Sequence, residues 1–220
     1  MVCPSYYDGS HHNKPSPSNT FNTPTGQIFR DSYLAHEISR LYDISIIRHF
    51  FGFPIFGAPP SLHEAAIVCL NASWWQHSQY PTTELGIAEL ITKGLSPTIH
   101  AENILRGMRV AHARIMPNAH LLNQYTEAGD PEAFNFGTTK FITIDEAKDI
   151  LINTFVRPRL IGDSNGTHQP IILIGHAVQN FVTHIKDSFG VDLMGLGTIV
   201  KVIDRTFGEL SWKRFRSSRR

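Results

Sequence analysis

Polar side chains lie where three predicted buried strands end, and these are the residues whose types could carry chemistry. They are Asn71 and Ser73 after the first of these strands, Gly175 and His176 after the second, and Asp204 after the last. Loops at one edge of an open α/β sheet bring side chains from several strands together, so we expect any site there. For His176, a structural role with satisfied hydrogen bonds is commoner than a ligand role.

Other catalytic patterns are missing from the sequence. The chain has no Gly-x-Ser-x-Gly elbow, no P-loop and no dinucleotide-binding fingerprint, since Gly195-Leu196-Gly197 precedes a predicted strand instead of opening a helix. No zinc-binding spacing such as His-Glu-x-x-His connects the histidines of the predicted α/β region, which are His112, His120, His168, His176 and His184.

Two features could contact nucleic acid. Trp74 and Trp75 follow the first strand, and aromatic faces stack on unpaired bases without sequence preference. Core packing is the commoner fate of such a pair. The last eight residues hold five basic side chains, which could contact phosphates, act as a nuclear signal or form an unstructured end.

Composition excludes several classes of protein. The 220 residues are 41% hydrophobic, and 20 basic against 19 acidic side chains give a net charge of +1, so overall charge does not favour nucleic acid. Cys3 and Cys69 are too few and too far apart for a disulfide framework or a cysteine zinc site. Without signal-peptide features or an apolar run of membrane-spanning length, we expect a soluble protein of the cytoplasm or nucleus with no membrane contact.

The elements that would position these residues begin after a polar N-terminal segment. Residues 1–31 are rich in Ser, Pro, Asn, Thr and His and are expected to be a disordered tail. Apolar residues at helical spacing predict an amphipathic helix over residues 32–49. The Phe- and Pro-rich stretch of residues 50–60 is expected to brace the domain, with a partner-docking patch as the alternative.

Residues 61–210 have the pattern of one mixed α/β domain, followed by a basic tail over 211–220. Thr143 and Glu146 form a capping box at a helix start, and Gly190 stands where a helix C-cap is needed. We therefore expect a mixed sheet flanked by helices. The predicted strands are residues 65–70, 83–90, 113–116, 170–176 and 198–203, and the predicted helices are 101–110, 144–155 and 178–188.

Five short motifs occur in an order and spacing that suggest a family. They are Thr83-Glu84-Leu85-Gly86-Ile87-Ala88, His112-Ala113-Arg114-Ile115, Asn123, Phe134-Asn135-Phe136-Gly137 and Gly175-His176. With these motifs, residues 62–210 resemble the ribonuclease-H-like fold of DEDD-type 3′–5′ exonucleases. In detail they are similar to the fungal domain at the C-terminus of "good for full DEAD-box helicase activity" proteins.

The resemblance implies a two-metal site that this chain has lost. Active members carry Asp-x-Glu on the first strand, Asn-x-x-x-Asp after Gly-His, and His and Asp on a final helix. Four carboxylates hold two divalent cations, and the His is a general base. The resemblance places Asn71, Ser73 and Asn180 at three of the carboxylate positions and Ala177 at the Asn. The chain ends sixteen residues after Asp204, before the expected final helix, which indicates C-terminal shortening.

The strength of charge–charge interactions indicates how far these replacements weaken metal binding. Unit charges about 4 Å apart interact by roughly 4 kcal/mol at an effective dielectric of 20. Each lost carboxylate then removes on the order of a hundredfold of metal affinity or more. Glu84 and Asp204 remain as weak metal-ligand candidates, which could bind one Mg²⁺ but would not assemble a two-metal site. We expect no intact catalytic residue and no cofactor.

Three hypotheses follow. The first is a non-catalytic domain that binds single-stranded nucleic acid or an RNA-metabolism protein, with Gly175, His176, Trp74 and Trp75 as candidate contacts. The second is an active exonuclease that uses Mg²⁺ or Mn²⁺ on Glu84 and Asp204. The third is a shortened gene product without independent function, which would be prone to aggregate or dimerise. The sequence favours the first and does not predict the oligomeric state.

Overall fold

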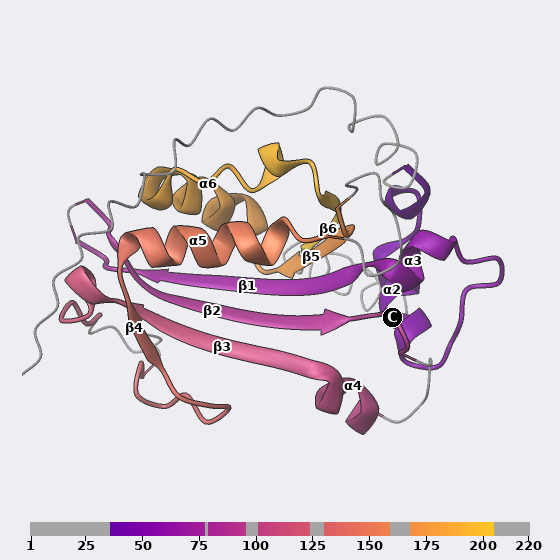
Figure 1. The fold of residues 1–220 in the computed structure, drawn as a ribbon, viewed down its shortest axis with the longest axis horizontal. Helices are drawn as coiled ribbons and strands as arrows, with labels where there is room; N and C mark the ends of the chain where they lie inside the picture. Colours follow the sequence, from indigo (N-terminus) through magenta and orange to yellow (C-terminus); the bar gives the residue numbers. More distant parts are fainter. Residues whose placement is uncertain (1–35, 78, 96–100, 124–129, 159–167, 205–220) are drawn as a thin grey trace, which may run out of the picture.

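The computed structural model describes residues 36–77, 79–95, 101–123, 130–158 and 168–204 (Figure 1). The predicted tails, residues 1–31 and 211–220, lie outside the described residues. The strands are β1 (Ala66–Trp74), β2 (Thr82–Ile91), β3 (Met108–Ile115), β4 (Lys140–Ile142), β5 (Ile171–Gly175) and β6 (Ile199–Asp204). The helices are α2 (Asp43–Phe50), α3 (Pro60–Glu64), α4 (Ala101–Gly107), α5 (Ile144–Phe155), α6 (Val178–Phe189) and the 3₁₀ turns Met116–Asn118 and Met194–Leu196.

The described strands form one sheet in the order β4-β3-β2-β1-β5-β6. Strand β2 runs antiparallel to β1 and β3, and the other neighbouring pairs are parallel. The predicted mixed sheet flanked by helices is confirmed, and it is the arrangement expected of a ribonuclease-H-like domain. No helix among the described residues is long and apolar enough to cross a membrane.

Helices α5 and α6 cover one face of the sheet, which we call the helix face (Figure 1). The apolar residues at alternate positions of β1 point into this core, together with those of β5 and the two helices. The predicted capping box is present, because the Thr143 hydroxyl accepts from the Glu146 amide and the Glu146 carboxylate accepts from the Thr143 amide. Gly190 ends α6 at φ 68°, as predicted.

The opposite face has two parts. Over β5 and β6, α2 and α3 form a second core in which Ile46, Phe50 and Leu62 pack against Ile172 and Ile203. Over the carboxyl end of β1 and the parts of β2 and β3 beside it, the described residues provide no helix, and we call this part the open face. Helix α4 contacts β2 near Leu90, at the other end of the sheet. The open face includes the exposed side chain of Asn71.

The predicted helix over residues 32–49 is interrupted. Residues 36–39 are helical, residues 40–42 are not, and α2 follows; Leu34 lies outside the described residues. The Lys201 ammonium of β6 explains why the break is stable, because it donates to the carbonyls of Ser39 and Leu41 at 3.1 and 2.9 Å. The same ammonium forms an ion pair with Asp43 at 2.9 Å. Helix ends leave carbonyls unsatisfied, and here a strand residue binds them.

Two strand boundaries also differ from the predictions. Strand β1 continues through Asn71 to Trp74 instead of ending at Leu70, because its polar residues alternate onto the open face. The predicted helix over residues 101–110 ends at Gly107, and β3 begins at Met108, where pairing with Leu90 of β2 outweighs helical periodicity. The three-residue strand β4 was not predicted.

Candidate functional site

The candidate site lies on the open face at the carboxyl end of β1. Asn71 and Ser73 flank Ala72 on this strand. Ala72 and the buried residues at alternate positions before it point toward the helix face. Strand alternation therefore places both side chains on the open face, where Asn71 is exposed and Ser73 half-buried. This is the geometry that a paired Asp-x-Glu would need, with an amide and a hydroxyl in place of the two carboxylates.

Glu84 belongs to this site. It lies opposite Ser73 in the β1–β2 register and shares the open face with it. The Glu84 carboxylate is 3.5 Å from Nε2 of His112 on β3, and Nδ1 of His112 is 2.9 Å from the Thr139 hydroxyl. The ring of Phe134 lies 5.2 Å from the His112 ring. These contacts join three of the five sequence motifs into one surface.

Asp204 has a different role. Its carboxylate accepts hydrogen bonds from the backbone amides of Ala177 and Val178, at 3.1 and 2.8 Å, at the start of α6. Ala177 is in the left-handed region at φ 51°, so the chain turns sharply from β5 into the helix. Free amides and the positive end of the helix dipole stabilise a carboxylate at this position. Asp204 therefore caps α6.

The structure does not bring Glu84 and Asp204 together. The strand order places them three strand spacings apart, and the registers offset them by three residues along the strands. With spacings of about 4.8 Å between strands and about 3.3 Å per residue, their backbones are roughly 17 Å apart. A shared metal ion cannot bridge that distance. Among the described residues, no group of three or more His, Cys, Asp or Glu side chains could hold a metal ion.

The donor set at the family's metal position does not fit two divalent cations. Asn71, Ser73 and Asn180 offer neutral amide and hydroxyl oxygens, while Mg²⁺ pairs in such sites are held by carboxylates. Asn180 lies in the first turn of α6 and is exposed. No hydrolytic step through a bound metal is derived from this arrangement.

The two members of the Gly-His motif are used differently. Gly175 is buried, and a Cβ atom on it would lie 2.8 Å from both Val178 Cγ2 and Phe181 Cε1. Its missing side chain therefore allows α6 to pack closely on β5. His176, the next residue, is exposed at the end of the strand.

The two tryptophans lie at and just past the end of β1. Trp74 packs against the helix-face core, and its ring lies 4.4 Å from that of His184. Core packing is thus the role of Trp74. Trp75 is half-buried just past the end of β1, where the pairing register shifts after Ser73, and its ring lies 4.6 Å from that of His77.

The sequence reasoning missed two polar groups that shape this region. Arg114 is buried on β3 opposite Glu84, donates to Glu132 and to the Ala119 carbonyl, and lies over the Phe141 ring at 5.4 Å. Asn123 holds the end of β1, donating to the Trp74 carbonyl and accepting from the Gln76 amide, each at 2.9 Å. Both residues belong to the five sequence motifs, and that membership was the feature of the sequence that could have identified them.

Comparison with known proteins agrees with this geometry. Residues 66–218, more than half of the chain, match the family "DNA polymerase III subunit epsilon-like, C-terminal domain". A search of curated proteins found no match. The matched region begins at the first residue of β1 and includes the whole sheet and the open face. This chain therefore belongs to the DNA polymerase III epsilon-like C-terminal domain family of DEDDh exonucleases, with a ribonuclease-H-like, DEDD-type domain.

Proposed function

We propose that this chain is a non-catalytic member of the DEDD exonuclease superfamily that binds single-stranded nucleic acid in RNA metabolism. The observation that carries the proposal is the pair Asn71 and Ser73 on the open face. Two neutral side chains at that spacing bind divalent cations weakly. Neither side chain carries a negative charge that would repel a phosphate backbone, and the Glu84 carboxylate beside Ser73 lies 3.5 Å from Nε2 of His112.

Trp75 is the proposed stacking group. It is half-buried and follows the end of β1, two residues after Ser73, while Trp74 packs against the helix-face core. A base can stack on its indole without sequence preference. His176 and Asn180 are exposed at the start of α6 and supply hydrogen-bond donors for phosphate or base edges.

One observation favours the second candidate function, an active exonuclease. Glu84 lies beside Ser73 on the open face, where a carboxylate could replace the missing Glu. Against it, the Asp204 carboxylate binds the amides of α6 and lies about three strands away. The geometry therefore supports binding over cleavage.

The test uses one fluorescein-labelled 12-nucleotide single-stranded RNA in two assays. After incubation with the full chain and millimolar Mn²⁺, a denaturing gel should show an intact band. In fluorescence anisotropy, Trp75→Ala should weaken binding by about tenfold. Phe56→Ala, which removes an exposed aromatic ring from a remote loop, is the matched control and should bind normally.

Each contrary result has a definite meaning. Progressive 3′ shortening that stops with chelator and with Glu84→Ala would establish the active exonuclease instead. An intact RNA that the wild-type chain does not bind would overturn the nucleic-acid role.

Restoring the carboxylates tests whether the three positions converge on one metal site. In the triple variant Asn71→Asp, Ser73→Glu and Asn180→Asp, Mn²⁺ affinity measured by calorimetry should rise by at least about a hundredfold. The added carboxylates would lie on the open face and at the start of α6. Unchanged Mn²⁺ affinity in a folded triple variant would show that these three positions do not converge.

A further inference from the structure

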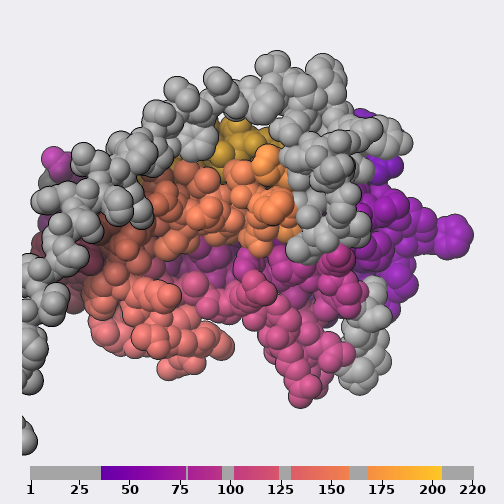
Figure 2. Space-filling model, in the orientation of Figure 1, coloured from indigo at the N-terminus to yellow at the C-terminus, as the bar shows by residue number. Residues whose placement is uncertain are grey.

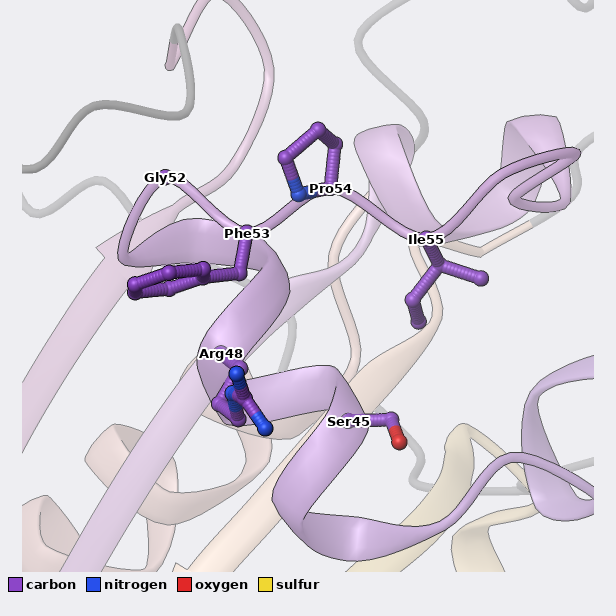
Figure 3. Close-up of a pocket in the computed structure, with 6 residues that line it drawn as sticks. All are labelled: Ser45, Arg48, Gly52, Phe53, Pro54 and Ile55. Carbon is purple, nitrogen blue, oxygen red and sulfur yellow. The ribbon is translucent and has the colours of Figure 1, made fainter.

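A hollow beside α2, remote from the open face, has the features of a binding site. It has a volume of about 440 Å³ and is lined by Ser45, Arg48, Gly52, Phe53, Pro54 and Ile55 (Figure 3). Ser45 and Arg48 come from the helix, and the other residues come from the chain that follows it. The segment of residues 51–59, which links α2 to α3, projects from the right edge of the molecule (Figure 2).

The wall of the hollow is held in place by backbone contacts. The Arg48 carbonyl accepts from the amides of Phe51 and Phe53, at 3.1 and 3.0 Å. The Ile55 amide donates to Nδ1 of the buried His49 at 3.0 Å. Gly52 turns the chain at φ 86°, a conformation that favours glycine. A ligand would therefore meet a wall that is already ordered, which reduces the entropy cost of binding.

The charge of the hollow is positive. Arg48 is the only Lys, Arg, Asp or Glu in residues 44–60. Its guanidinium lies 4.9 Å from the centre of the Phe53 ring, and within the described part of the chain no carboxylate pairs with it. The ring restricts the guanidinium while its N–H groups stay free at the edge. Such a group binds carboxylates in a planar, two-point geometry.

The surroundings of the hollow are apolar and exposed. Ile44, Arg48 and Phe51 follow one outer stripe of α2, and the side chains of Ile44, Phe51 and Phe53 are exposed, as is Phe56 on the projecting segment. This exposed surface extends beyond what a small carboxylic acid would cover. It fits a chain that presents an acidic residue next to apolar ones.

We propose that this hollow binds an acidic peptide segment of a partner protein. An Asp or Glu carboxylate of the partner pairs with Arg48, and a neighbouring apolar side chain enters between Phe53 and Ile55. The site is separate from the proposed nucleic-acid surface, so either can fail without the other.

The test is selection from a random heptapeptide phage library on the immobilised full chain. Wild-type protein should enrich peptides in which Asp or Glu adjoins Leu, Ile or Phe. Arg48→Gln and Phe53→Ala should each lose that enrichment, while Arg106→Gln, which removes an exposed arginine on α4, should retain it. An enriched peptide, resynthesised with blocked ends, should bind Arg48→Gln about tenfold more weakly than wild type.

Three results would overturn the proposal. The first is no acidic-apolar enrichment on the wild-type chain. The second is equal enrichment on folded Arg48→Gln, with folding checked by circular dichroism. The third is displacement of the peptide by hexanoate at equal concentration, which would identify a site for small carboxylic acids instead of a peptide site.

Discussion

Gly175 shows how a single missing side chain fixes the approach of a helix to a strand. A Cβ atom there would lie 2.8 Å from Val178 Cγ2 and from Phe181 Cε1. Both side chains are buried at the start of α6, so a methyl group on residue 175 would have to displace them. The Gly-His motif therefore has a packing reason that is independent of catalysis.

We predict that Gly175→Ala destabilises the protein by about 1 to 3 kcal/mol, the usual cost of an overpacked core. Urea unfolding measures this difference. Gly86→Ala is the matched control, since Gly86 also lies in a strand and a Cβ there would meet no atom within 4 Å. Equal stability of the two variants would mean that α6 adjusts freely and that the close contact is not needed.

His49 gives the segment after α2 a pH dependence. Its Nδ1 accepts the Ile55 amide, so protonation removes this acceptor. Burial lowers the pKa of His49 below its ordinary value, and the nearby His63 lowers it further. The unfolded chain then takes up this proton at a higher pH than the folded protein does. The resulting stability is complete above about pH 6.5 and decreases as the pH falls toward the folded-state pKa.

We predict that wild-type protein loses more unfolding free energy between pH 7.5 and pH 5.5 than His49→Asn does. The Asn side chain offers an amide oxygen as acceptor and does not titrate. Urea unfolding at the two pH values gives both differences, and the histidines other than His63, which is coupled to His49, contribute equally to each protein. Parallel losses would show that His49 does not titrate in this range.

At the scale of elements, Lys201 joins the N-terminal segment to the sheet. Its ammonium binds two carbonyls at the helix break and the Asp43 carboxylate, and the side chain is largely buried. Removing it leaves the partly buried Leu41 carbonyl, and the more exposed Ser39 carbonyl and Asp43 carboxylate, without this partner. We expect Lys201→Met to destabilise the protein by about 1 to 3 kcal/mol.

Hydrogen exchange locates the effect of Lys201→Met. The amides of α2 should exchange faster than in wild type, while those of α5 should not change. Lys140→Met on β4, where the lysine is exposed, is the control and should leave both helices unaffected. Unchanged exchange in α2 would mean that apolar contacts alone hold this segment.

Elements whose signals lie in neighbouring residues could be predicted from the sequence, and elements that depend on contacts with distant residues could not. The capping box and Gly190 are local signals, so the start of α5 was predicted correctly and the end of α6 to within one residue. The break after residue 39 depends on Lys201, which is about 160 residues away along the chain, so periodicity alone predicted one helix.

The same distinction applies to the site. The resemblance assigned Asn71 and Ser73 to two carboxylate positions, but the predicted strand ended at Leu70, so their shared strand face was not predicted. The capping role of Asp204 could not be predicted either, because it depends on the turn at Ala177 and on how β6 aligns with β5. Trp74 and Trp75 are both half-buried, and the packing of Trp74 against the helix-face core depends on the end of β1, where the register shifts after Ser73.

At the scale of the whole molecule, the segment before residue 61 is part of the folded domain. Ile38, Ile46 and Phe50 are fully or almost fully buried, and they cover Ile172 and Ile203 of the sheet. Each of these three side chains contributes about 1.5 to 3 kcal/mol on burial, so together they provide about 6 kcal/mol. That is comparable with the total stability of a domain of this size.

We therefore predict that a chain beginning at residue 61 does not fold stably, although the matched family region starts at residue 66. Its β5–β6 face would be exposed, so it should bind an apolar dye and elute from gel filtration as aggregates. The chain beginning at residue 32 keeps α2 and α3 and is the control, expected to unfold cooperatively. Cooperative unfolding of both chains, with equal midpoints in urea, would show that the second core is dispensable. The covering role of α2 would then be secondary to its partner-binding role.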